Sequence, residues 1–111
     1  MKFEVKDWWY EQEQTKAGKY NWTLCWGRVY EQEDEEGNKK RIPEIHAKYL
    51  IDKGEDVKEV GYYLCGDKVR ETEKAIQVIL SYWNLNKAGR YVTDAPVEKK
   101  WKTWIPKSVL I

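Results

Sequence analysis

The chain is poor in the residues that build metal centres. Its 111 residues contain one histidine, His46, and two cysteines, Cys25 and Cys65. A structural zinc site takes four cysteine or histidine ligands, so these three residues are too few for one. A cysteine in a reducing compartment usually packs as a small hydrophobe. We therefore expect two buried thiols, with a disulfide or a metal pair as the alternative, and we expect no resident metal or cofactor.

Long apolar runs are missing as well. No stretch approaches the roughly 18 apolar residues that indicate a membrane span. The first residues, Met1-Lys2-Phe3-Glu4, lead into charged sequence rather than into the apolar segment of a signal peptide. From these two absences we expect a cytoplasmic protein with no membrane contact.

No spacing in the sequence marks a catalytic or nucleotide-binding centre. Gly27, Gly61 and Gly66 belong to neither of the common phosphate-binding patterns, G-x-x-x-x-G-K-[ST] and G-x-G-x-x-G. His46 falls on a strand face that is predicted to point to solvent. No serine or cysteine nucleophile with a recognisable motif accompanies it. We therefore expect a protein that is not an enzyme.

Aromatic and charged residues are abundant instead. The chain has seven tryptophans, eight tyrosines and 35% charged residues, with a formal net charge of +1. This combination predicts a small sheet with one buried face and a strongly solvated exterior. The length fits a single domain over residues 1–111. Acidic residues outnumber basic ones in residues 1–36 and the reverse holds afterwards, which is too mild an asymmetry to indicate nucleic acid.

Three polar turns containing glycine divide the first 66 residues, at 15–18, 35–38 and 53–56. The segments beside these turns alternate between apolar and polar residues, as strands with one covered face do. The predicted strands cover residues 3–13, 20–33, 40–51 and 58–65. Because the turns are short, neighbouring strands pair antiparallel, and residues 1–66 are expected to form a four-stranded β-meander.

Residues 67–88 show a different period. Five apolar residues fall within one arc of a helical wheel: Ala75, Ile76, Ile79, Leu80 and Trp83. An isolated helix of this length is marginal in water, so its apolar arc must pack on the sheet. The expected fold class is α+β, with this amphipathic helix on one face of the meander. With this helix covering one face of the sheet, other indole rings would stay partly exposed. These exposed rings would form a recognition surface, so that surface depends on the helix.

The last segment, residues 89–111, fits two structures. Val97, Trp101, Trp104 and Ile105 have helical spacing, and Asp94 is placed to cap a helix. Residues 100–104 also alternate like a strand. We favour a short second helix over residues 94–105, with a strand as the alternative.

An acidic run is the first candidate contact surface. It consists of Glu31, Glu33, Asp34, Glu35 and Glu36. The order of these acids does not match a calcium-binding loop. One interpretation is a solvated hairpin tip whose charge discourages edge-to-edge strand pairing. The other is an acidic patch that binds a protein partner.

Tryptophans provide the other candidates. Trp8 and Trp9 are adjacent, so in a strand one ring points into the core and the other points away. The outward ring is either covered by the C-terminal segment or left exposed for a partner. The C-terminal candidates are Lys100, Trp101, Lys102 and Trp104. These indoles either anchor the core while the lysines stay solvated, or stack on bases while the lysines neutralise phosphates.

Several segments resemble small proteins encoded by phages and prophages of low-GC Gram-positive bacteria. The likeness covers residues 20–84 and rests on Trp26-Gly27-Arg28-Val29-Tyr30, on Glu36-Gly37-Asn38, and on Ala75-Ile76, Ile79-Leu80 and Tyr82-Trp83-Asn84. Some such proteins are anti-defence factors, including anti-CRISPR inhibitors. The resemblance implies a non-enzymatic protein in the host cell cytoplasm.

The sequence therefore predicts a binding protein that occludes a surface of a larger protein partner, as an anti-defence inhibitor does. Single-stranded nucleic-acid binding through the C-terminal tryptophans and lysines is the alternative.

Overall fold

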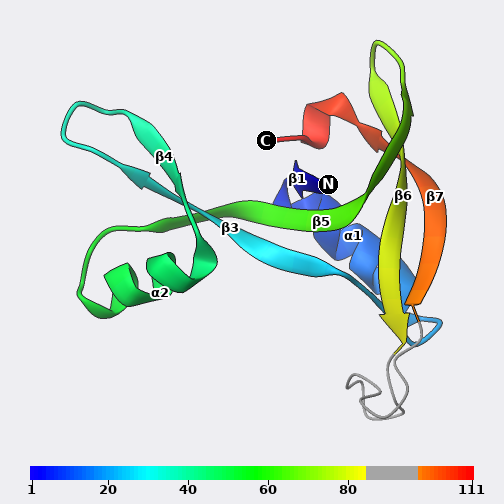
Figure 1. Cartoon of the computed structure of the whole chain (residues 1–111), viewed down its shortest axis with the longest axis horizontal. Coiled ribbons are helices and arrows are strands. Elements are labelled where there is room, and N and C mark those ends of the chain that lie inside the picture. The colour runs from blue at the N-terminus through cyan, green and yellow to red at the C-terminus, as the bar shows by residue number, and fades with distance from the viewer. Residues whose placement is uncertain (85–97) are drawn as a thin grey trace.

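A computed structural model describes residues 1–84 and 98–111 (Figure 1). Its elements are, in chain order, β1 (Lys2–Val5), α1 (Asp7–Gly18), β2 (Trp22–Leu24), β3 (Trp26–Glu33), β4 (Lys39–Ile42), α2 (Glu44–Asp52), β5 (Lys58–Glu71), β6 (Ala75–Asn84), β7 (Glu98–Pro106) and a 3-10 helix, Lys107–Val109. All paired strands run antiparallel. The expected α+β class with an antiparallel sheet is confirmed, but seven described strands replace the predicted four-stranded meander.

The sheet has the strand order β2-β6-β5-β3-β4, with β1 added at β5 and β7 added at β6. The long strand β5 joins its two halves, because residues 58–64 pair with β3 and residues 66–71 pair with β6. The last residues of the chain turn back onto β1, where Val5 forms a bridge with Leu110. The two chain ends therefore lie near each other (Figure 1).

The main core lies on the inner face of β6 and β7, under helix α1. Burial alternates along β6, where Ile76, Val78, Leu80 and Tyr82 are all buried. The other buried members are Phe3, Val5, Trp9, Tyr10, Ala17, Leu24, Leu64, Ile105 and Val109. Burying a side chain of this size contributes about 1.5–3 kcal/mol, so this cluster supplies most of the apolar stabilisation.

A second, smaller cluster lies at the other end of the molecule. It contains Tyr30, Ile42 and Ala47, with Leu50 and Val57 packed against them. We call residues 30–57 the α2 lobe. In Figure 1 this lobe projects away from β6, β7 and α1. Its core is much smaller than the main one, so the lobe depends on its pairing with β5 for stability.

The helix predicted over residues 67–88 is wrong. Residues 67–71 belong to β5 and residues 75–84 form β6, while residues 85–88 lie outside the described part of the chain. The Thr72 N–H donates to the Ala75 carbonyl oxygen at 2.8 Å, which closes the turn between the strands. Residues 75–84 alternate strictly and are rich in β-branched and aromatic residues, so they fit a strand better than a helix.

Two of the predicted strands contain helices instead. Residues 3–13 end their strand at Val5 and continue into α1, where glutamate, glutamine, lysine and alanine favour a helix. Residues 40–51 leave β4 at Ile42, and Pro43 precedes α2. Proline is well placed beside the first turn of a helix because it lacks the N–H that would have no partner there.

The other segments are strands, with different bounds. Residues 20–33 divide at Cys25 into β2 and β3, and residues 58–65 lie within the longer β5. Residues 98–106 form β7, so the favoured C-terminal helix is wrong from Glu98 onward and the alternative strand is confirmed there. Residues 94–97 lie outside the described residues.

One side chain of α1 completes the free edge of β2. The Gln14 side-chain oxygen accepts hydrogen bonds from the Leu24 N–H and from the Thr23 hydroxyl, both at 3.1 Å. Its side-chain nitrogen donates to the Trp22 carbonyl oxygen at 3.5 Å. Gln14 thus takes the place of a neighbouring strand, and it satisfies polar groups beside the buried Leu24 and Thr23.

Replacing Gln14 by alanine is expected to lower the free energy of unfolding by about 1–3 kcal/mol, because the Leu24 N–H loses its partner. The Thr23 hydroxyl is left with only its longer contact, 3.4 Å, to the Leu24 carbonyl oxygen. Urea denaturation followed by circular dichroism measures this change. Gln12→Ala is the matched control, since Gln12 is exposed on the same helix. Equal stability of the two variants would contradict the role given to Gln14.

Candidate nucleic-acid interface

The strands β6 and β7 form a regular two-stranded surface. Residues directly opposite each other in an antiparallel pair share a face, and the register joins Gln77 to Trp104, Ile79 to Lys102 and Ser81 to Lys100. We call this surface the outer face. Its members are Ala75, Gln77, Ile79, Ser81 and Trp83 of β6, with Glu98, Lys100, Lys102, Trp104 and Pro106 of β7. All five β7 members are exposed, because the buried residues of β6 point to the other side.

The outer face carries cations that form no ion pair with the residues the structure describes. Neither Lys100 nor Lys102 takes part in any ion pair of the described residues. Arg70 of β5 lies opposite Gln77, which is itself opposite Trp104. The Arg70 guanidinium carbon lies 5.3 Å from the centre of the Trp104 ring. Three cationic side chains therefore share one surface with an indole that is 39% exposed.

A second indole marks the other end of the outer face. Trp83 is half-buried and lies six residues along β6 from Gln77, the partner of Trp104. At about 3.3 Å per residue, this places the two indoles about 20 Å apart along the strand. Lys100 and Lys102 lie between them in the register. Two acids share the surface, Glu98 opposite Trp83 and Asp67 opposite Ile79, so the face is only moderately basic.

Trp101 is separated from this surface by the sheet. Its ring is half-buried and packs edge-on against Tyr82, with ring centres 5.2 Å apart, and against Trp22 at 6.4 Å. The Lys99 ammonium lies 4.2 Å from the Trp101 ring centre. Burial raises the pKa of the Tyr82 phenol to about 12, as expected for a ring enclosed beside Trp101. Trp101 is thus a core anchor, whereas Lys100, Lys102 and Trp104 face the solvent together.

Trp8 and Trp9 lie in the first turns of α1 rather than in a strand. Trp9 is 5% exposed and belongs to the main core, while Trp8 is 56% exposed. Adjacent side chains of a helix point about 100° apart, so one of these two rings can enter the core while the other faces solvent. Trp8 is placed on a different element from Trp104 and is not part of the outer face.

The acidic run lies in the hairpin between β3 and β4, opposite a basic run. Glu31 forms an ion pair with Arg41, and Glu33 faces Lys39 in the register. The Asp34 carboxylate accepts hydrogen bonds from the backbone N–H groups of Glu36 at 2.9 Å and Asn38 at 2.8 Å. Glu31 is therefore matched by a cation across the hairpin, Asp34 is held by backbone N–H groups, and Glu35 and Glu36 remain exposed at the tip.

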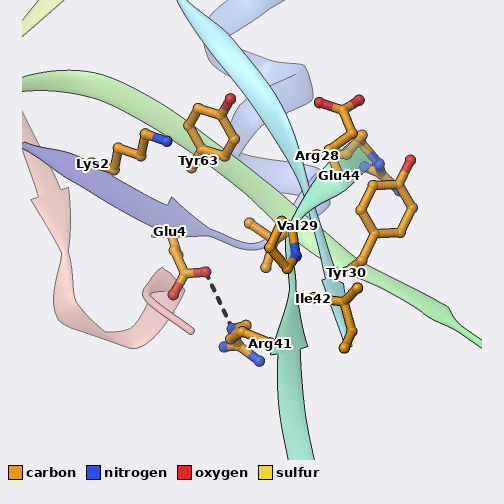
Figure 2. A pocket seen from close by; sticks show the side chains of 10 residues that line it. Lys2, Glu4, Arg28, Val29, Tyr30, Arg41, Ile42, Glu44 and Tyr63 are labelled. Carbon is orange, nitrogen blue, oxygen red and sulfur yellow. Dashed lines mark hydrogen bonds and ion pairs between the residues drawn. The ribbon is translucent and has the colours of Figure 1, made fainter. Parts of the chain in front are cut away.

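A pocket of about 480 Å³ lies between β1 and β4 (Figure 2). It is lined by Lys2, Glu4, Arg28, Val29, Tyr30, Arg41, Ile42, Pro43, Glu44 and Tyr63. Arg41 is paired with Glu4 at 3.2 Å, and Arg28 is paired with Asp7 at 3.3 Å. The Lys2 ammonium lies 4.3 Å from the Tyr63 ring centre. Because Arg28 and Arg41 are already paired with acids, these two cations are poorly placed to select an ionic ligand in the pocket.

Sequence reasoning missed Arg70 and Trp83 as members of a site. Both belong to the outer face only because β5, β6 and β7 pair in this register. Within the described ranges, no group of three or more histidine, cysteine, aspartate or glutamate side chains is placed to hold a metal ion. The helices of residues 1–84 and 98–111 include none long and apolar enough to cross a membrane.

Comparison with known proteins returned no matches: no family model, no curated protein and no solved structure is similar to this chain.

Proposed function

We propose that the protein binds single-stranded nucleic acid along the outer face of β6 and β7. The observation that carries this proposal is the pair of indoles, Trp83 and Trp104, on one side of the sheet. They bracket Lys100 and Lys102, which form no ion pair with another described residue. Lysines neutralise backbone phosphates, and indole rings stack on bases. The distance of about 20 Å between the indoles is the length of a few extended nucleotides.

Several features favour a single strand over a duplex. Stacking on an indole requires an unpaired base whose ring face is open, and a duplex keeps its bases stacked on each other. Lysine is a point charge without the planar fork that reads guanine in a major groove. We therefore expect binding with little sequence preference and a strong dependence on salt.

Titration with a short oligonucleotide at low salt tests this function, with tryptophan fluorescence as the readout. Quenching is expected with single-stranded DNA and much less with the matching duplex. Trp104→Ala is expected to weaken binding about 5- to 150-fold, since one stacked base is worth about 1–3 kcal/mol.

Trp8→Ala is the matched control for that experiment, because Trp8 is an exposed indole on another element. It is expected to leave the affinity unchanged. Absence of quenching at low salt, or an equal loss in both variants, would overturn the proposal.

A protein partner is the second candidate, and an exposed apolar ridge on α2 favours it. Ile45 is 84% exposed and Tyr49, one turn later, is 54% exposed. A helix presenting such a ridge fits an apolar groove of another protein. The sequence-based argument for a partner surface rested on a helix at 67–88, but residues 67–71 and 75–84 of that range form strands. The exposed ridge on α2 therefore becomes the candidate surface for a protein partner. An anti-defence role, expected from the resemblance to phage proteins, stays a prediction.

A further inference from the structure

Cys25 and Cys65 lie side by side at the point where the chain passes from β2 to β3, next to β5. The register that pairs Trp26 with Leu64 brings these cysteines opposite each other at the next position. The Cys65 N–H donates to the Cys25 carbonyl oxygen at 3.1 Å, while the Cys25 N–H donates to the Ser81 carbonyl oxygen of β6 at 2.9 Å. Cys25 is therefore the point at which the β2–β3 segment passes from β6 to β5.

The two thiols lie in direct contact, with their sulfur atoms 2.9 Å apart. Both side chains are partly exposed, which corrects the expectation of two buried thiols. Contact between sulfurs means that a bond between them needs little movement of the backbone. Partial exposure means that a small oxidant reaches them without unfolding.

We propose that Cys25 and Cys65 form a redox-active dithiol, which is converted to an intramolecular disulfide by exchange with a low-molecular-weight disulfide such as glutathione disulfide. In the first step, the thiolate of one cysteine attacks a sulfur of the small disulfide. A mixed disulfide forms and one small thiolate leaves, to be protonated by solvent. In the second step the other cysteine, after losing its proton, attacks the protein sulfur of the mixed disulfide and displaces the second small thiol. The protein loses two electrons and two protons, and the small disulfide is reduced to two thiols.

The disulfide would tie the α2 lobe to the main body. The cysteines are 40 residues apart in the sequence, and the residues between them include β3, β4 and α2. Cross-linking the ends of such a loop restricts the unfolded chain and favours the folded state. The lobe has only a small core of its own, so this restraint acts on the part of the molecule that needs it most.

The rate of this reaction depends on the pKa of Cys65. Burial, together with a hydrogen bond to Cys25, raises that pKa to about 11. The thiolate is the reacting form, so little of Cys65 is reactive at neutral pH. Its thiolate fraction rises about tenfold per pH unit below the pKa. Oxidation is therefore expected to be slow near pH 7 and to accelerate as the pH rises toward 9.

Incubation of the reduced, folded protein with excess glutathione disulfide at pH 8 tests the proposal. The expected product is a monomer with no free thiol and no glutathione adduct, in which peptide mapping joins the segments around Cys25 and Cys65. Its Tm is expected to exceed that of the reduced form by roughly 10 °C, and dithiothreitol should reverse the change.

Two single variants keep the test decisive. Cys25→Ser and Cys65→Ser each retain one thiol, which is expected to end as a stable mixed disulfide with glutathione. Three results would each overturn the proposal. The wild-type protein could keep stable glutathione adducts, or it could form a disulfide-linked dimer. Its two thiols could also persist in the folded protein and react only after denaturation. None of these results bears on nucleic-acid binding, which is measured on the reduced protein.

Discussion

Reversing both Lys100 and Lys102 to glutamate is expected to weaken the binding of single-stranded DNA about 100-fold at low salt, where each factor of ten corresponds to about 1.4 kcal/mol. Both side chains are exposed on the outer face and neither is engaged by an acid of the described residues. Each substitution removes one lysine–phosphate interaction and adds a repulsive charge. Because two phosphates are no longer neutralised, the slope of log K against log salt is expected to become shallower by about 1.4. Fluorescence titrations at several salt concentrations give both quantities.

The control for this experiment makes the same change in net charge at a different site on the protein. Lys39 and Lys40 are exposed on β4, in the α2 lobe, and their reversal to glutamate alters the net charge by the same amount. We expect only a small decrease in affinity and a nearly unchanged salt slope. If both double variants lost affinity equally, binding would depend on total charge rather than on the outer face, and the proposed site would be wrong.

The largest error of sequence-based prediction concerns the strand β6. Ile76 and Leu80 satisfy both a helical period and a strand period, so they cannot separate the two structures. Val78 separates the two structures, because it is buried in the strand alternation while a helix would place it off the apolar arc. The hairpin with β5 and the nine paired positions of β7 complete this strand, and neither partner is visible in a local pattern.

The helices were missed for a different reason. In α1 the buried Trp9, Tyr10 and Ala17 do lie on one helix face, with the half-buried Glu13 and Gln14 between them. The middle of this face is polar, so the apolar residues alone do not show the helical period. The short helix α2 buries only Ala47, so its sequence carries almost no amphipathic signal toward the core.

The candidate site was partly predictable. Lys100, Lys102 and Trp104 share a face once residues 98–106 form a strand, and that alternation is readable in the sequence. Strand alternation also places Trp101 on the opposite side, which resolves its two interpretations in favour of the core. Arg70 and Trp83 required the register between strands, a property set by packing over the whole sheet.

Substituting Gly66 by alanine is expected to lower the free energy of unfolding by about 3 kcal/mol, at the upper end of the usual cost of overpacking. Gly66 lies where β5 leaves β3 and β1 to pair with β6. A Cβ atom at this position would lie 2.2 Å from the carbonyl oxygen of Ile79. That oxygen belongs to the backbone of β6, so the clash is removed only if β5 and β6 move apart. Such a movement would disturb the close packing of the main core.

Alanine substitutions at two other glycines provide the comparison for this stability change. A Cβ at Gly27 would lie 2.1 Å from the Tyr63 ring, but this ring can rotate away, so Gly27→Ala is expected to cost less than Gly66→Ala. A Cβ at Gly18, the last residue of α1, meets nothing within 4 Å, so Gly18→Ala is expected to be neutral or to stabilise by up to about 1 kcal/mol. Urea denaturation of the three variants gives the order. Because backbone cannot yield as a side chain does, a Gly66→Ala variant as stable as Gly18→Ala would mean that β5 and β6 are not packed this closely.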